Sequence, residues 1–326
     1  MSLGGSLPYN LRQNKSIERS LFLDLLSRIG RYRNISDYTY IGFGGPFLED
    51  FKFLHSILRI QKMISIESDL NVSARQKFNL PLSCIHIENK LSGDFLTSHD
   101  FTEASIVWFD YAIPKLLGEQ ISETHSLVSK LTAGDIFKIT LNASPDALGM
   151  PSDPKGDLKE HRAKVAEKRL GDYGPAVVDP DSVTSANFPA LLLQALHSAC
   201  KRGVEGDRRL YVQPLSAFVY RDGQQMLTAT AIILNHADRE AFFSQTRLKH
   251  WDHRNFEWEK PRSISVPDMS AKERLYVESK LPDGDALSIR NSLGYFLGGN
   301  ERDAQELLEN FVNYYRLSPH YSRIVV

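Results

Sequence analysis

Three glycines at the end of a predicted strand are the first residues of this chain whose spacing suggests chemistry. The stretch YTYIGFGGPFLEDF places Gly42, Gly44 and Gly45 between a strand-like run and a helix-like run. A turn that binds a nucleotide needs glycine, because the chain must turn sharply and its backbone must approach the ligand closely. The dinucleotide pattern G-x-G-x-x-G would require glycine at position 47, where the chain has Phe47. The turn therefore suits a nucleoside better than a pyrophosphate.

Acidic residues follow the next two predicted strands, where they could bind the sugar and the base of a nucleoside. Glu67 ends the strand about 20 residues past the turn, where α/β nucleotide folds place a carboxylate on the ribose hydroxyls. Asp69 is the close alternative for this role. Asp94, in SGDFL after the third strand, is a candidate acceptor for the exocyclic amine of adenine at the same sheet edge.

The fourth predicted strand also ends in residues that could do chemistry. Asp110 and Tyr111, in WFDYAIP, follow a deeply apolar run. Ligands of open sheets bind at the carboxyl ends of the strands, and an acid buried there would be costly without a partner. We expect Asp110 to position or deprotonate the group that reacts, with Tyr111 beside it.

Strand-like runs alternate with helix-like runs from residue 38 to residue 143, a rhythm typical of a parallel sheet with helices on both faces. Two β-rich runs then flank Asp222-Gly223, which predicts that the sheet ends in an antiparallel hairpin. Residues 144–188 are rich in Pro, Asp and Gly and form an insertion after the fifth strand. Long connections of this kind are commonly lids, so we expect the insertion to cover the site.

These pieces together resemble the Rossmann-like, class I methyltransferases that depend on S-adenosylmethionine. The motifs that carry the resemblance are GFGGP, SIESD, GDF, FDYAIP and the hairpin YRDGQQ. More narrowly, LRQNKSIERSLF, YIGFGGPFLEDF and SIESDLNVSARQKFN resemble a bacterial family of O-methyltransferases. The resemblance implies an α/β fold with a mostly parallel, seven-stranded sheet and S-adenosylmethionine as cofactor. We expect a methyltransferase domain over residues 8–248 and a mostly helical extension over residues 249–326.

The sequence departs from that class in two places, and these keep other functions open. Tyr40 and Ile41 stand at the end of the first strand, where such enzymes usually carry an acid. The motif around Asp110 is not the D/N-P-P-Y of amino methylation of bases. The alternative is therefore a catalytically inactive nucleoside-binding or interaction module with this fold. A nicotinamide oxidoreductase is disfavoured by Phe47 and by the terminal hairpin.

Basic residues give weaker indications. Arg12 and Lys15 precede the first predicted helix, where cations oppose the helix dipole, so an anchoring role toward substrate or cofactor is open. The stretch KEHRAKVAEKR inside the insertion is a net basic helix, either solvated or phosphate-binding. His250, Asp252 and His253 lie close together in sequence, but they lack the clear spacing of a metal site, so no metal is expected.

The composition of the chain limits the classes of function that are open to it. The 326 residues carry a net charge of -1, so no global basic field would attract nucleic acid. The two cysteines form no metal or redox spacing, and no apolar run approaches a membrane span of about 20 residues. We expect a cytoplasmic protein with a small-molecule substrate. Nucleic acid as a partner and self-association into a homo-oligomer both stay open.

Overall fold

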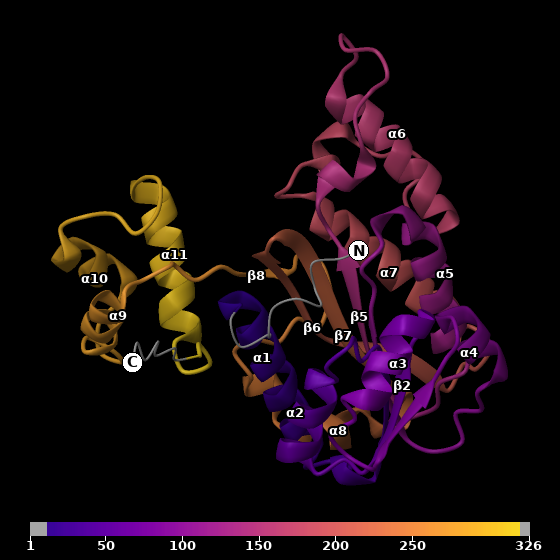
Figure 1. The fold of residues 1–326 in the computed structure, drawn as a ribbon. Coiled ribbons are helices and arrows are strands. Elements are labelled where there is room, and N and C mark those ends of the chain that lie inside the picture. The colour runs from indigo at the N-terminus through magenta and orange to yellow at the C-terminus, as the bar shows by residue number, and fades with distance from the viewer. Residues whose placement is uncertain (1–11, 320–326) are drawn as a thin grey trace. The chain divides into compact units, whose positions relative to one another are not determined.

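A computed structural model of the chain describes residues 12–319. It contains an eight-stranded sheet in the order β3-β2-β1-β4-β5-β7-β6-β8 (Figure 1). The strands are β1 Thr39–Gly42, β2 Lys62–Ile66, β3 Ile85–Glu88, β4 Ser105–Asp110, β5 Ile136–Asn142, β6 Leu210–Asp222, β7 Gln224–Asn235 and β8 Arg262–Ile264. The helices are α1 Gln13–Ile29, α2 Glu49–Leu58, α3 Leu70–Phe78, α4 Ser92–Ser98, α5 Leu117–Val128, α6 Leu158–Leu170, α7 Phe188–Val204, α8 Arg239–Thr246, α9 Ala271–Glu278, α10 Ala286–Leu293 and α11 Glu301–Tyr314.

The sheet confirms the predicted fold class. Strands β1 to β5 pair in parallel, and β7 pairs antiparallel to β5. The hairpin turns at Asp222-Gly223, where Gly223 adopts a φ of 104°. An eighth strand, β8, was not among the seven predicted. It has three residues and follows Pro261, so it is too short to show an alternating pattern in the sequence.

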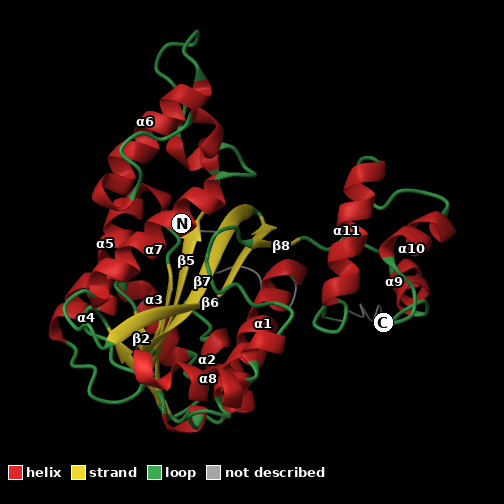
Figure 2. Cartoon of the chain, turned by 180° about the vertical axis from the view of Figure 1, so that it is seen from behind, coloured by secondary structure: helices red, strands yellow, loops and turns green. Residues whose placement is uncertain are grey.

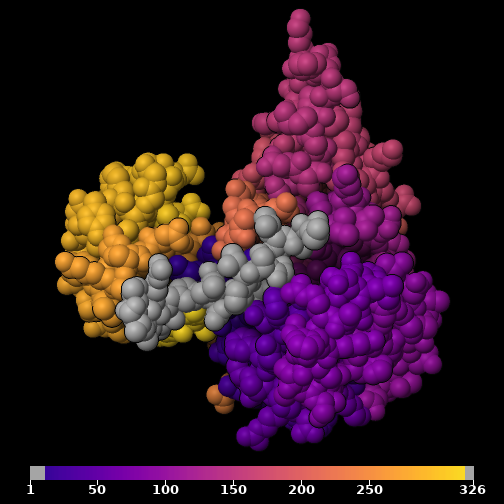
Figure 3. Space-filling view, viewed as in Figure 1, coloured from indigo at the N-terminus to yellow at the C-terminus, as the bar shows by residue number. Residues whose placement is uncertain are grey.

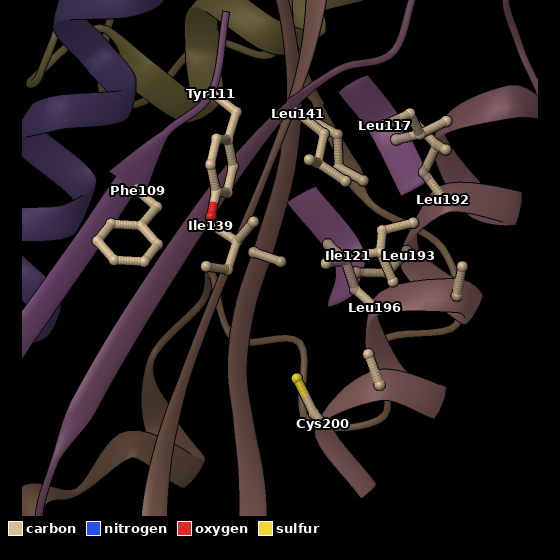
Figure 4. Close-up of a cluster of buried hydrophobic side chains, with 14 of the residues drawn as sticks. Phe109, Tyr111, Leu117, Ile121, Ile139, Leu141, Leu192, Leu193, Leu196 and Cys200 are labelled. Atoms are coloured by element: carbon tan, nitrogen blue, oxygen red, sulfur yellow. The ribbon is translucent and has the colours of Figure 1, made fainter. Parts of the chain in front are cut away.

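The two faces of the sheet differ in character because side chains alternate along a strand. On one face, Ile139 and Leu141 of β5 pack toward α5 and α7, and this apolar face forms the main core (Figure 4). The opposite face, on the side of α2 and α8 (Figure 2), carries Trp108, Lys138 and Thr140 in neighbouring strands. The second face is therefore polar at the centre of the sheet, although all three side chains are buried.

Contacts divide the chain into two compact units. The larger one contains residues 23–219 and 224–262, and thus most of the sheet together with the predicted site. Of the described residues, those up to 22, residues 220–223 and those from 263 onward form the smaller unit. This unit holds α9, α10 and α11, and α9 begins with a capping box formed by Ser270 and Glu273. Contacts thus group residues 249–262 with the larger unit, and the predicted start at residue 8 lies outside the described residues.

The insertion over residues 144–188 packs onto the same apolar core as the helices around it. Its helix α6 buries Ala163, Ala166 and Leu170, the small residues allowing a close approach. The Nε2 atom of Gln225 in β7 donates to the carbonyl oxygens of Ala143 and Ser185, 3.3 Å and 2.8 Å away. One side chain therefore holds both ends of the insertion against the sheet.

The closest contact between α5 and α6 is backbone against backbone. A Cβ atom at Gly118 would lie 2.4 Å from the carbonyl oxygen of Arg169, whereas a Cβ at Gly206 would meet nothing within 4 Å. We expect Gly118→Ala to lower the free energy of unfolding by about 1–3 kcal/mol, because overpacking forces the two helices apart. Urea denaturation measures this, with Gly206→Ala as the matched control, which should stay within about 0.5 kcal/mol of the parent. Equal stabilities for the two variants would contradict the contact.

Candidate active site

The glycine turn lies at the carboxyl end of β1, and its three glycines serve different purposes. A Cβ at Gly42 would lie 2.9 Å from the carbonyl oxygen of Trp108, and one at Gly44 would lie 2.6 Å from the Oγ of Ser65. These two positions are glycine because the backbone packs against the protein itself. Gly45 differs, since it adopts a φ of +52° and nothing lies within 4 Å of its Cβ position. Of the three, Gly45 is the one that offers open space to a ligand.

Side chains from α3 hold this turn in place. The Nε2 of Gln76 donates to the carbonyl oxygen of Gly45 at 2.9 Å, and the Nδ2 of Asn79 donates to that of Pro46 at 2.9 Å. Gln76 is fully buried, and its Oε1 accepts from Ser65 Oγ at 3.1 Å. Leu48, which follows the turn, is buried with a φ of 53°, a conformation that is strained for a residue other than glycine. The turn is thus a fixed, preorganised shape.

Glu67 and Asp69, the two candidate ribose ligands after β2, make different contacts in the structure. Asp69 caps α3, because its Oδ1 accepts from the backbone N–H groups of Asn71 and Val72. Glu67 caps no helix. It is half-buried, its Oε1 accepts from the N–H of Asp69 at 2.9 Å, and burial raises the pKa of its carboxyl above the ordinary value. Each acid uses one carboxylate oxygen in these bonds, and the two differ in their role and burial: Asp69 caps a helix and is exposed, whereas Glu67 is half-buried at the strand end.

Asp94 follows β3, but it lies in the first turn of the helix α4, and its side chain is exposed. The start of this helix is tied to α5, because Ser92 Oγ donates to Glu123 Oε2 at 2.7 Å. The segment proposed to contact adenine is therefore held by a carboxylate that the sequence did not single out.

Asp110 and Tyr111 do not lie side by side, although they are neighbours in the sequence. Asp110 pairs in register with Thr140 and so shares the polar face of β4 with Trp108. Tyr111 lies on the apolar face near Phe109 (Figure 4). The ring of Phe43 from the glycine turn packs against both. The structure thus separates the two side chains to opposite faces of the sheet.

The hydroxyl of Tyr111 donates to Glu123 Oε2 at 2.6 Å, the same oxygen that accepts from Ser92. Burial, and then the Glu123 carboxylate, raise the pKa of Tyr111 well above its ordinary value. The hydroxyl therefore stays protonated and joins the end of β4 to the start of α4 through Glu123. This geometry favours a positioning role for Tyr111 over direct proton transfer.

A buried lysine below Asp110 is the main feature that the sequence analysis missed. Lys138 is fully buried in β5, and its Nζ lies 3.5 Å from the ring centroid of Trp108. The indole Nε1 of Trp108 donates to Thr140 Oγ1 at 3.0 Å. A lysine in the middle of the apolar run DIFKITLNA was the available signal, since such a residue is rarely buried without function or partner.

Two of the predicted residues, Arg12 and Lys15, belong to the smaller unit. The backbone N–H of Lys15 donates there to Asp222 Oδ2 at 2.6 Å. Within residues 12–319, no three His, Cys, Asp or Glu side chains gather in a way that could hold a metal ion. Among the helices of the same residues, none has the length and hydropathy needed to cross a bilayer.

The buried contact between Tyr111 and Glu123 can be tested by removing its donor. Tyr111→Phe leaves a buried carboxylate oxygen with one donor fewer, so we expect a loss of about 1–3 kcal/mol in the free energy of unfolding. Tyr295→Phe is the matched control, because Tyr295 also donates to a glutamate, Glu273, but on the surface. Urea denaturation should show a change of under about 0.5 kcal/mol for the control. A loss no larger than the control's would show that the buried bond contributes nothing.

Comparison with known families gives a match over almost the whole chain. The model of the family described as "Putative O-methyltransferase" matches residues 7–326. No curated protein matches the sequence. Among solved structures, the chain resembles Trm1 from Pyrococcus horikoshii with S-adenosyl-L-methionine, at 8% identity and a TM-score of 0.46, covering 71% of this chain and 57% of that one. It also resembles the O-methyltransferase from Bacillus cereus in complex with SAH, at 11% identity and a TM-score of 0.36, covering 65% of this chain and 79% of that one.

A third similar structure is the N-methyltransferase NodS from Bradyrhizobium japonicum, at 10% identity and a TM-score of 0.38. It is matched over 67% of this chain and 97% of its own length. The chain thus spans little more than half of the Pyrococcus protein and nearly all of NodS. The family match itself rests on almost the full sequence. The chain therefore belongs to the "Putative O-methyltransferase" family, as its sequence predicts.

Proposed function

We propose that the protein transfers the methyl group of S-adenosylmethionine to an oxygen acceptor at the carboxyl ends of β1, β2 and β4. The observation that carries the proposal is the half-buried Glu67 beside a glycine turn that α3 holds rigid. A carboxylate in this place can accept from both vicinal hydroxyls of a ribose. Asp69, the competing acid, is already used as a helix cap.

The residues present fit an adenosine moiety. Gly45 leaves open space next to the turn, since nothing lies within 4 Å of its Cβ position. Asp94 is exposed at the start of α4 and can accept from the adenine amine. We assign cofactor binding to Gly42, Gly44, Gly45, Glu67 and Asp94, with the first two shaping the turn.

S-adenosylmethionine supplies a methyl group already activated by its sulfonium, so the protein mainly has to align an acceptor. Proximity and orientation then provide most of the rate. Asp110 lies at the end of β4 on the polar face, where its carboxylate can hold an acceptor hydroxyl and take its proton. Tyr111 contributes by fixing this strand end to α4 through Glu123.

One observation favours a second candidate, an inactive nucleoside-binding module. At the end of β1, Tyr40 occupies the stretch where related enzymes carry an acid, and its ring is buried edge-on against Phe51 at 4.8 Å. A packed aromatic cannot bind the amino group of the methionine part through charge. Binding of the cofactor without transfer to any acceptor would favour this module.

Thermal shift with three ligands separates the candidates. S-adenosylmethionine and S-adenosylhomocysteine should raise the melting temperature, since a ligand that binds only the folded state stabilises it, and NAD should not. Transfer of labelled methyl to a cell extract then distinguishes the enzyme from the inactive module. Stabilisation by NAD alone would overturn both candidates.

Substitution of the two acids at the end of β2 gives a sharper test. Glu67→Gln removes the charged acceptor and should weaken S-adenosylmethionine binding by about 1.5–3 kcal/mol, roughly tenfold to a hundredfold. Asp69→Asn is the matched control and should leave the affinity within a few-fold, because Asn also caps helices. Isothermal titration calorimetry measures both. Equal affinities would remove Glu67 from the site.

The same carboxyl predicts a pH dependence. Burial raises the pKa of Glu67, so as the pH falls through that raised value the side chain gains a proton and loses its charge as an acceptor. The affinity for S-adenosylmethionine should therefore fall on the acid side in the parent protein. It should be flat over the same range in Glu67→Gln, and a parallel decline in both would assign the titration to another group.

A further inference from the structure

A concave groove lies between α6 and the segment that follows β4. Its volume is about 750 Å³, and its charged lining residues are Lys115, Glu119, His161, Lys164, Lys168 and Arg169. Four permanent cations thus face one carboxylate. The whole chain is nearly neutral, so this positive field belongs to the groove and not to the protein as a whole. The insertion that contributes α6 projects from the larger unit (Figure 3).

The cations of α6 divide into two groups. Lys159 pairs with Asp181 and Arg162 pairs with Asp146, each at 2.7 Å. Lys164 and Lys168 are exposed in the groove, and within the described residues neither has an ion pair. The groove therefore holds the positive charge of this helix that acids do not already neutralise.

The spacing of these groups forms a row. His161, Lys164 and Lys168 lie three and four residues apart and so share one face of the helix, roughly one turn, about 5.4 Å, between neighbours. From His161 to Lys168 the row is about 10 Å long. Lys115 stands on the opposite wall. Positive groups repeat along a line and do not converge on one point.

The walls of the groove are fixed to each other. The Nη1 of Arg169 donates to the carbonyl oxygens of Pro114 and Ala147, at 3.2 Å and 3.0 Å. The backbone of α6 also touches α5 at Gly118, where no Cβ would fit. Arg169 thus joins α6 to the segment after β4, and the groove needs no large rearrangement before it binds a ligand.

We propose that this groove binds the phosphates of single-stranded RNA. A row of cations in an open channel follows a sugar–phosphate backbone, whereas sites for small ligands are enclosed and mostly apolar. Among the described residues, the lining has no Phe, Tyr or Trp ring, and the single imidazole of His161 offers only a small stacking surface, so the groove mainly contacts the backbone and not the sequence. The sequence analysis expected a small-molecule substrate and left nucleic acid open, and this proposal takes the second of these.

The inference rests on the proposed methyl transfer and names its substrate class. Lys115 follows Asp110 by five residues, so the two lie at most about 17 Å apart along an extended chain. The groove lies on the side of the apolar core and Asp110 on the polar face, so a strand must extend from the groove across the carboxyl edge of the sheet to bring a ribose hydroxyl, an oxygen acceptor, to Asp110. The groove thus supplies the acceptor to the edge of the sheet that binds the cofactor.

The test is the salt dependence of binding to a fluorescein-labelled, 20-nucleotide single-stranded RNA, measured by anisotropy on the full chain. Four phosphate contacts predict a binding constant that falls about fiftyfold between 50 and 200 mM salt. Lys164→Gln with Lys168→Gln removes two contacts, so the fall should shrink to about sevenfold. Lys52→Gln with Lys272→Gln, two exposed lysines outside the groove, is the matched control and should behave as the parent.

Other results would overturn the proposal. These are absence of RNA binding by the parent at 50 mM salt, an unchanged salt dependence in the groove variant, or competition by inorganic phosphate or a mononucleotide as effective per phosphate as that by unlabelled RNA. Calorimetry with S-adenosylmethionine on the same proteins keeps the two proposals apart. Cofactor binding without RNA binding refutes the groove alone, whereas RNA binding without cofactor binding refutes the methyl transfer.

Discussion

The close approach of the glycine turn to its neighbours is the constraint on which the candidate site depends. At Gly42 and Gly44 the space that a Cβ would need is taken by Trp108 and Ser65, so the turn lies directly against the sheet. Gln76 and Asn79 then fix its carbonyl groups from α3. These contacts lie within the protein, so the turn has its shape before any ligand binds. Binding therefore costs little conformational entropy at the turn.

The sequence carries most of the fold because its signals are local. The glycines, the apolar runs that end in acids and the Asp222-Gly223 turn each specify a feature within a few residues, and the observed β1 to β7 follow from them. The same holds for the helix inside the insertion, which α6 reproduces. The short strand β8 has no such pattern and depends on pairing with the edge of a sheet that is already formed.

The sequence identified candidate site residues at the ends of the strands, but it did not determine their partners or their roles. Which of two nearby acids caps a helix depends on the geometry of α3, and Glu67 and Asp69 look alike in the sequence. Strand alternation predicts that Asp110 and Tyr111 point to opposite faces of the sheet. This alternation continues past the end of β4 only because Tyr111 packs against Phe43 and bonds to Glu123, which are distant in the chain. Long-range partners of this kind leave no mark in a single sequence.

The two hydrogen bonds of Gln225 at the ends of the insertion determine which changes of sequence the sheet can tolerate. The side chain of Gln225 in β7 donates hydrogen bonds to the carbonyl oxygens of Ala143 and Ser185. The residues between these two positions therefore form a loop whose ends are both fixed to the sheet. Its interior can lengthen, shorten or change charge while the strand ends keep their register. Insertions of other lengths or charges could therefore be accommodated at this position without a change in the sheet.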